Sequence, residues 1–222
     1  MENKMINIAV DGPAGAGKST ISKIVAKKLN IIYLDTGAMY RGLACLAYDN
    51  DVEPSDENAV NKLIKDVCME IKYEYGLQQV IVNGKNQTPY IREHKVSKGA
   101  SDISKHPSVR LKMVDLQREI ASKIDVILDG RDIGTFVLPN AKYKFFLVAT
   151  PEERAKRRYI ELVEKGQKDV KLEDVLADIN QRDKNDSSRA LAPLKQADDA
   201  IKIDTTDMTI DEVVEVILSY IK

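Results

Sequence analysis

Residues 12–20 read Gly12-Pro13-Ala14-Gly15-Ala16-Gly17-Lys18-Ser19-Thr20. This stretch fits the pattern G-x-x-x-x-G-K-[ST], which is typical of loops that bind nucleotide phosphates. The β-branched run at 6–10 predicts a buried strand before it, and apolar residues at helical spacing follow it over 21–29. A strand, a Gly-rich turn and a helix in this order predict that backbone N–H groups of the turn surround an anion at the amino end of the helix.

Two side chains of this loop have distinct predicted roles. Lys18 has the reach to contact the β- and γ-phosphates of a nucleotide, and the Ser19 hydroxyl is placed to bind Mg²⁺. We therefore predict that 12–20 forms the nucleotide-binding site. The alternatives are a Gly-rich turn without a ligand and a dinucleotide-binding loop. The second is excluded because G-x-G-x-x-G requires glycine at the position of Ala14.

The composition and the hydropathy pattern limit the possible binding partners and the cellular location. Apolar residues make up 43% of the 222 residues, which is enough for a sizeable core. Basic and acidic residues nearly cancel, at 34 and 35, so a nucleic-acid partner is disfavoured. The sequence shows no apolar run of membrane-spanning length and no signal-peptide core, so we expect a cytoplasmic protein that does not bind membranes. Cys45 and Cys68 fall in apolar helical patterns and are expected to be buried free thiols.

Strands and helices alternate along most of the chain. Further strands are predicted at 31–35, 126–129, 144–149 and 200–204. Helices are predicted at 38–48, 58–70, 94–104, 107–123, 151–166 and 172–182, and a last one follows the capping box Thr209-x-x-Glu212. This alternation predicts an α/β fold in which a parallel sheet carries the phosphate loop and is flanked by helices on both faces.

One segment departs from the alternation. Over 71–75 the apolar residues recur with a period of two, Gly76 interrupts the pattern, and 80–82 resumes it. Asn83-Gly84 is a strong hairpin signal, and 88–91 is predicted to form a third short strand. We therefore predict a small antiparallel β insertion in the α/β domain.

Charged residues follow the predicted strand 126–129. Asp129 ends this strand, where an acid can hold the water shell of Mg²⁺ near Ser19; a strand-end Asp that only caps a loop is the alternative. Gly130, Arg131 and Asp132 come next. They place a cation and a second acid at the carboxyl edge of the sheet, where open α/β folds bind ligands.

Arginines form two groups with helical spacing. The first group holds Arg154, Arg157 and Arg158 at spacings i, i+3 and i+4, and the second holds Arg182, Asp186 and Arg189 at spacings i, i+4 and i+7. Like charges this close on one helix face repel each other, and an anion between them relieves the repulsion. Arginine also binds phosphate through two parallel hydrogen bonds. The groups therefore favour phosphate clamps, with an ordinary solvated face as the alternative.

Missing motifs exclude other reactions. The sequence contains neither D-x-x-G nor N-K-x-D, so a regulatory GTPase is disfavoured, and no Cys/His pair or G-x-S-x-G motif indicates covalent catalysis. Transfer of a phosphoryl group to a phosphate acceptor needs no covalent catalyst. The acceptor oxygen is already ionised, so the protein must align two anions and neutralise their charge.

Four motifs carry a resemblance to a known family. They read GPAGAGKST at 12–20, LDTGAMYR at 34–41, DGRDIGT at 129–135 and QRD-x-x-D-x-x-R-A-x-APL at 181–194. Over essentially the whole chain, the sequence resembles the bacterial cytidylate kinases, which are P-loop nucleoside monophosphate kinases. The resemblance implies that ATP, with Mg²⁺, donates its γ-phosphate to CMP or dCMP to give ADP and CDP or dCDP.

The resemblance also implies a domain organisation and a setting. The chain, 1–222, is expected to form a single P-loop kinase domain, with a monophosphate-binding subdomain inserted at about 55–100 and a short lid at about 154–190. We expect a monomer that acts in pyrimidine metabolism on small-molecule substrates and binds neither nucleic acid nor membranes.

Residue roles follow from the matched motifs. The resemblance assigns the phosphate of CMP to Arg41, Arg131 and Arg189, the cytosine to Ser101, Arg110 and Asp132, and the ribose to Arg182 and Asp186. It places Arg154, Arg157 and Arg158 in the lid over the ATP phosphates, and the predicted catalytic residues are Lys18, Asp129, Arg131 and Arg182. Thr36 stands where the family pattern has Ser and keeps the hydroxyl, so we expect it to bind substrate too. The stretch 184–188 is less basic than the family pattern.

Two other classes of function stay open at this point. Another small-molecule kinase of the same fold would act on AMP, UMP, shikimate or dephospho-coenzyme A. A non-catalytic switch would bind nucleotide without turnover, although the base-reading motif of such switches is absent. A coupled assay with a panel of acceptors separates these classes.

Overall fold

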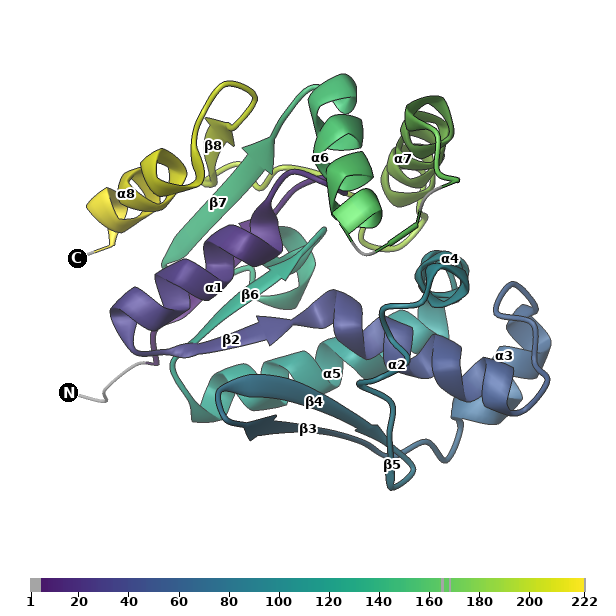
Figure 1. Cartoon of the computed structure of the whole chain (residues 1–222). Coiled ribbons are helices and arrows are strands. Elements are labelled where there is room, and N and C mark those ends of the chain that lie inside the picture. The colour runs from purple at the N-terminus through teal and green to yellow at the C-terminus, as the bar shows by residue number, and fades with distance from the viewer. Residues whose placement is uncertain (1–4, 165, 168, 222) are drawn as a thin grey trace. The chain divides into compact units, whose positions relative to one another are not determined.

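The computed structural model describes residues 5–164, 166–167 and 169–221 (Figure 1). The chain divides into two compact units. One comprises the chain up to Tyr33 and from Lys123 onward, and the other is the intervening segment Leu34–Ser122. The first unit is thus built from two segments that are far apart in the sequence.

A parallel sheet forms the centre of the first unit. Within the described ranges its five strands are β1 (Asn7–Asp11), β2 (Ile32–Asp35), β6 (Val126–Gly130), β7 (Tyr143–Val148) and β8 (Ile201–Asp204). Their spatial order is β2-β6-β1-β7-β8, and β1 pairs in parallel with both β6 and β7. Such sheets need nearly continuous apolar strands because helices cover their faces. The predicted parallel sheet is confirmed.

Helices α1 (Lys18–Leu29) and α8 (Ile210–Tyr220) pack against each other and on this sheet (Figure 1). Val25 of α1 belongs to the same buried apolar cluster as α8 and the central strands. The Thr209 hydroxyl accepts the Glu212 N–H, and the Glu212 carboxylate accepts the Thr209 N–H. The predicted capping box at the start of α8 is therefore confirmed.

Helices α6 (Pro151–Glu164) and α7 (Leu172–Ser187) follow β7 and pack on each other. Leu162 and Ile179 are buried in a small core between them, and Gly166, with φ 85°, follows the end of α6. α7 is one turn longer than the predicted helix. Neither these nor any other helix of the described ranges is long and apolar enough to cross a membrane.

A π-helix, η1 (Ile133–Val137), follows β6. The N–H of Val137 donates to the carbonyl of Asp132 at 3.0 Å, which is the i to i−5 pattern of a π-turn. No pattern in the sequence predicted this element. It begins directly after Arg131 and Asp132, and π-turns are frequent at functional sites.

The second unit combines helices with a small sheet. Its helices are α2 (Thr36–Asp49), α3 (Glu57–Ile64), α4 (His94–Ile103) and α5 (Pro107–Lys123). In the part of the chain that the structure describes, the sheet has three strands in sequence order: β3 (Met69–Glu74), β4 (Leu77–Val82) and β5 (Lys85–Asn86). Left-handed turns at Tyr75-Gly76 and Asn83-Gly84 join antiparallel neighbours. The predicted antiparallel insertion is confirmed.

The predicted helix over 58–70 is too long. α3 ends at Ile64, because Met69 and the residues after it pair with β4 in the small sheet. Cys68 lies between helix and strand and is exposed, so the expectation of a buried thiol is correct for Cys45 and wrong for Cys68. Strand pairing thus outweighs the local helical periodicity.

The predicted strand at 88–91 is also wrong. The third strand is the shorter β5, which starts directly after the Asn83-Gly84 turn. The N–H of Val80 is accepted by the hydroxyl of Thr88 at 2.9 Å rather than by a backbone carbonyl. A side chain therefore replaces the strand ladder there, and the chain turns away from the sheet.

Gly42 lets α2 pack closely on the small sheet. A Cβ at this position would lie 2.6 Å from Val80 Cγ1 and 3.3 Å from Val82 Cγ2. We predict that Gly42→Ala lowers the free energy of unfolding by roughly 1–2 kcal/mol because the site is overpacked. Alanine at an open helical site would instead stabilise by about 1 kcal/mol. Urea denaturation of both proteins measures the difference.

Val80→Ala is the matched partner, because it removes the methyl group that the new Cβ meets. In the Val80→Ala background the cost of Gly42→Ala should largely disappear. An undiminished cost in that background would show that this contact does not limit the packing of α2.

Candidate active site

The loop that joins β1 to α1 depends on its glycines. Gly12 has φ 145°, and a Cβ there would lie 2.1 Å from the carbonyl oxygen of Leu147 on β7. Gly15 and Gly17 have φ 79° and 83°, in the left-handed region that favours glycine. The loop therefore lies tightly on β7 and presents its backbone at the amino end of α1, which is the geometry that binds phosphate.

Lys18 is the cation of this loop. It is only 6% exposed, and its Nζ donates to the carbonyl oxygen of Pro13 at 2.7 Å. Burial lowers the pKa of Lys18 well below its usual value, and the positive charge of Arg131 lowers it further, against the opposing effect of Asp129. A phosphate beside Lys18 would favour the charged form again.

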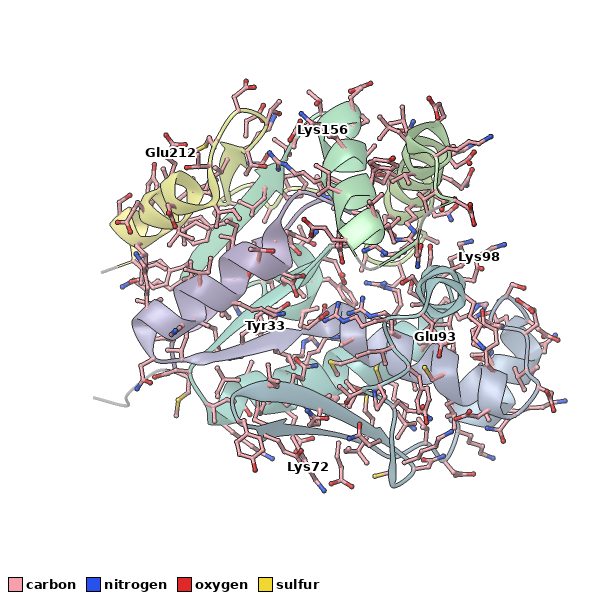
Figure 2. All side chains as sticks on the ribbon, in the orientation of Figure 1. Tyr33, Lys72, Glu93, Lys98, Lys156 and Glu212 are labelled. Atoms are coloured by element: carbon pink, nitrogen blue, oxygen red, sulfur yellow. The ribbon has the colours of Figure 1, made fainter. Side chains whose placement is uncertain are left out.

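The acid at the end of β6 receives two hydroxyl donors. Ser19 Oγ donates to Asp129 Oδ2 at 2.6 Å, and Tyr33 Oη donates to Asp129 Oδ1 at 3.1 Å. Tyr33 comes from β2 and is labelled in Figure 2. Among the residues described, no group of three or more His, Cys, Asp or Glu side chains is arranged to hold a metal ion. A cation here would therefore take further oxygen ligands from water and a nucleotide.

Asp186 on α7 joins two arginines. Its Oδ2 accepts from Arg131 Nε at 2.7 Å, and its Oδ1 accepts from Arg189 Nη2. Burial alone would raise the pKa of Asp186, but Arg131 and Arg189 outweigh burial and hold the pKa below its usual value. The ionised carboxylate thus keeps two predicted phosphate-binding arginines side by side.

Arg154 is held entirely among protein atoms. It is 3% exposed, and its Nε donates to the carbonyl of Ala149 at 3.0 Å. Its Nη1 donates to the carbonyl of Ala14 in the phosphate loop at 3.0 Å and pairs with Asp183 of α7 at 2.7 Å. Arg154 therefore connects α6, α7 and the phosphate loop.

Arg157 and Arg158 have different surroundings. Arg157 donates to the Thr205 hydroxyl at 3.1 Å, which ties α6 to the connection after β8. Arg158 pairs with Glu161 at 2.7 Å. Burial lowers the pKa of Arg182, and the charge of Arg158 lowers it further. Arg158 and Arg182 therefore lie close enough to repel each other, and an anion between them would be stabilising.

Asp11 was not predicted as a site residue. It lies directly before the phosphate loop and is 3% exposed. Its Oδ1 accepts the N–H of Ile133 at 2.8 Å, and its Oδ2 accepts the N–H of Gly134 at 2.7 Å. Burial raises the pKa of Asp11 to about 7, although these hydrogen bonds act against the increase. An acid at the end of a buried strand is the signal that identified Asp129, and it applies to Asp11 equally.

Thr36 and Arg41 lie on α2 in the second unit. Asp35 caps this helix by accepting the Ala38 N–H at 2.8 Å, and it also accepts Arg41 Nη2 at 2.8 Å. Thr36, the first residue of the helix, is buried. Arg41 Nε is buried and finds no hydrogen-bond partner among the described residues. Arg41 therefore has a donor left for a substrate.

Ser101 and Arg110 also belong to the second unit. Arg110 is 1% exposed, its Nη1 donates to the Ser104 carbonyl at 3.3 Å, and its guanidinium lies 5.8 Å from the ring centre of Tyr40. Ser101 Oγ is buried without a hydrogen-bond partner in the part of the chain that is described. Asp132, the third predicted cytosine contact, belongs to the first unit. That all three residues contact one base therefore stays a prediction.

These observations define a class of protein. A glycine-rich loop follows the central strand of a parallel sheet, and cations lie at the carboxyl edge of that sheet with an acid beside the loop serine. This combination is characteristic of a P-loop kinase. A crystal structure of an uncharacterised protein from Eubacterium ventriosum superposes with a TM-score of 0.52 at 15% identity, over 98% of both chains, and this likeness concerns the fold alone.

Comparison with known sequences gives the family. The family model described as Cytidylate kinase matches residues 8–222. A cytidylate kinase of Lactobacillus johnsonii is 51% identical over 99% of this chain and 95% of its own length. Another, of Halalkalibacterium halodurans, is 49% identical over 99% of this chain and 98% of its own length. The chain belongs to the cytidylate kinase family, which confirms the resemblance seen in the four motifs; it is a nucleoside monophosphate kinase.

The lowered pKa of Lys18 leads to a prediction about protons. At a pH of about 8 part of the free protein carries neutral Lys18, whereas phosphate anions beside it raise its pKa. Binding of a nucleoside triphosphate such as ATP should therefore take up protons from the buffer. Calorimetric titration in two buffers with different ionisation enthalpies measures this uptake.

Lys18→Met is the control, because it has no group to titrate there. This variant should bind nucleotide more weakly and without the proton uptake that depends on the lysine. Identical binding heats for the unchanged protein in both buffers, or the same uptake in Lys18→Met, would contradict the prediction.

Proposed function

We propose that this kinase transfers the γ-phosphate of ATP to CMP or dCMP and releases ADP and CDP or dCDP. One observation carries the proposal: Lys18 is buried in the phosphate loop, and Arg131 is held by Asp186 at 2.7 Å, near enough for its charge to lower the pKa of Lys18. The first comes from the phosphate loop and the second from the end of β6. Two cations held together in this way suit two phosphates rather than one neutral ligand.

Transfer between two phosphates needs alignment and charge neutralisation. Lys18 binds the β- and γ-phosphates of ATP, and Arg131 binds the acceptor phosphate, which is already ionised and needs no general base. Arg182 adds positive charge where the transferred group becomes more negative. Asp186 keeps Arg131 in orientation through its 2.7 Å hydrogen bond.

Ser19 and Asp129 are the proposed ligands of Mg²⁺. Their oxygens lie 2.6 Å apart, so both fit within one coordination sphere, and hard oxygen ligands suit this cation. Held by these two residues, Mg²⁺ would supply positive charge that neutralises part of the phosphate charge. Tyr33 holds the second oxygen of Asp129 in place.

Arginines dominate the proposed site for the sugar phosphate. The phosphate of CMP binds Thr36, Arg41, Arg131 and Arg189, and the ribose binds Arg182 and Asp186. The buried Arg41 Nε, which lacks a partner among the described atoms, supports this role because arginine recognises phosphate through several donors at once.

Three side chains read the base in this proposal. Asp132 accepts the N4 amino group of cytosine, and Arg110 donates to N3 and O2, with Ser101 as a further partner. The buried Ser101 Oγ supports the assignment, since a buried hydroxyl with no described partner is costly unless a ligand satisfies it. Uracil presents an acceptor where cytosine has its amino group and should be rejected.

The segment at about 154–190 is the proposed lid over ATP. Arg158 contacts the ATP phosphates, because without an anion it repels Arg182. Arg154 and Arg157 stay near the phosphates as supports, since the phosphate loop and Thr205 already accept their hydrogen bonds. The segment at about 55–100 is the proposed monophosphate-binding subdomain of a single kinase domain.

The proposed setting follows from the reaction. The substrates are small molecules of pyrimidine metabolism, and we place the enzyme in the cytoplasm as a monomer without nucleic-acid or membrane partners. The near balance of 34 basic and 35 acidic residues supports the absence of a nucleic-acid partner.

An acceptor panel tests the reaction. In a coupled assay with ATP and Mg²⁺, CMP and dCMP should be phosphorylated far faster than UMP, AMP or shikimate. Lys18→Ala should lower kcat for CMP by roughly a hundredfold or more, because it removes charge stabilisation made in the transition state. Equal rates for all acceptors, or an unchanged kcat in folded Lys18→Ala, would overturn the mechanism.

Asp132→Asn tests base reading. The amide can donate to O4 of uracil but cannot accept from N4 as a carboxylate does. We predict a loss in kcat/KM for CMP of about 10- to 100-fold and a smaller loss for UMP. Asp115→Asn, an exposed change on α5, controls for loss of a surface charge. Equal losses on both substrates would remove Asp132 from base recognition and leave it as a support for Arg131.

A further inference from the structure

We propose that Asp11 is a positioning residue for the acceptor nucleotide. It fixes the backbone that carries Arg131 and Asp132 against the strand that carries the phosphate loop. The inference rests on the proposed function, because that function assigns Arg131 and Asp132 to CMP.

Asp11 continues the connection between β1 and β6 past the end of both strands. It is the last residue of β1, and its Cα lies opposite Gly130, the last residue of β6. In the described part of the chain, the ladder between β1 and β6 ends at this pair. The carboxylate of Asp11 takes over, since its two oxygens accept the N–H groups of Ile133 and Gly134 at 2.8 and 2.7 Å.

These two N–H groups begin the π-turn η1. The first N–H groups of a helical element have no partner inside it, and leaving them buried and unsatisfied is costly. Asp11 satisfies both of them. The dipeptide Arg131-Asp132 is therefore held at both ends, by the β6 ladder at Gly130 and by Asp11 at Ile133.

Gly134 permits this contact. A Cβ on Gly134 would lie 3.4 Å from Asp11 Oδ2, in ordinary van der Waals contact, and 3.2 Å from Lys144 Cδ, so the Lys144 side chain would have to shift by a small amount. The close approach of the backbone to Asp11 thus leaves little room for a side chain larger than that of alanine.

The phosphate loop has supports of its own that do not involve Asp11. Gly12 packs on the Leu147 carbonyl, Lys18 donates to Pro13, and Arg154 donates to Ala14. Loss of the Asp11 contacts should therefore disturb the acceptor residues more than the residues that hold ATP. This asymmetry separates a positioning role from a general role in stability.

Asp11→Asn is the direct test. The amide has nearly the same shape, but it can accept only one of the two N–H groups and presents its own donor to the other. We expect kcat/KM for CMP to fall roughly tenfold or more, chiefly through a higher KM for CMP, while KM for ATP changes less than about twofold. Steady-state kinetics with each substrate varied in turn measures the split.

Asp125→Asn is the matched control. Asp125 Oδ1 accepts the N–H of Ile6 at 2.7 Å and so joins the start of β6 to the start of β1. This contact lies at the amino ends of the same two strands, away from Asp11. Its loss should leave the KM for CMP unchanged. Equal KM values for CMP in Asp11→Asn and in the unchanged enzyme, or equal effects of the two asparagine variants, would overturn the proposal.

Gly134→Val replaces Asp11→Asn if the latter does not fold, because its γ-methyl groups have little room beside Asp11 and Lys144. It should raise the KM for CMP in the same selective way, and a uniform effect on both substrates would count against the proposal. Hydrogen exchange of the segment 131–134, without substrates, tests the positioning separately. Faster exchange of this segment in Asp11→Asn than in Asp125→Asn supports the positioning role of Asp11. It does so even if the enzyme is inactive on CMP, a result that would refute only the proposed function. Equal exchange in the two variants contradicts the positioning role.

Discussion

The first unit depends on stabilising positive charges that folding removes from water. Lys18 and Arg154 are buried and Arg131 is half-buried, and the interior of a protein penalises charges that lack a partner. Asp183 and Asp186 of α7 pair with the two arginines, and the phosphate loop offers its carbonyls to Lys18 and Arg154. The acids of α7 therefore stabilise these arginines before any phosphate arrives.

Acids at strand ends illustrate how one residue type serves several purposes. Asp129 at the end of β6 accepts two hydroxyls, whereas Asp11 at the end of β1 accepts two backbone N–H groups. Asp35 at the end of β2 caps α2 and binds Arg41, and Asp204 at the end of β8 accepts the N–H of Thr206 in the loop that follows. The strand end supplies the position, and the segment that approaches it decides the role.

This distinction explains how far the sequence could predict the molecule. The phosphate loop, the parallel strands and the capping box at Thr209 are local patterns, and each was predicted correctly. The ends of the helix over 58–70, the strand at 88–91 and the π-turn depend on pairing with distant segments and were missed or misplaced. At the site, Lys18 and Asp129 follow from motifs. Asp11 has partners more than a hundred residues away, so no window of sequence reveals them.

The arrangement of the sheet has a consequence for how the chain is made. β1 leaves the ribosome roughly 120 residues before β6, so at about 5–20 residues per second it waits roughly 6–24 s for its first central neighbour. During that interval Leu34–Ser122, a compact unit by its own contacts, is completed. The nascent chain can thus carry a folded insertion while its phosphate loop has not yet folded. An apolar strand with two unpaired edges stays open to other chains for that time, which makes the late arrival of β6 and β7 the vulnerable period in the biogenesis of this kinase.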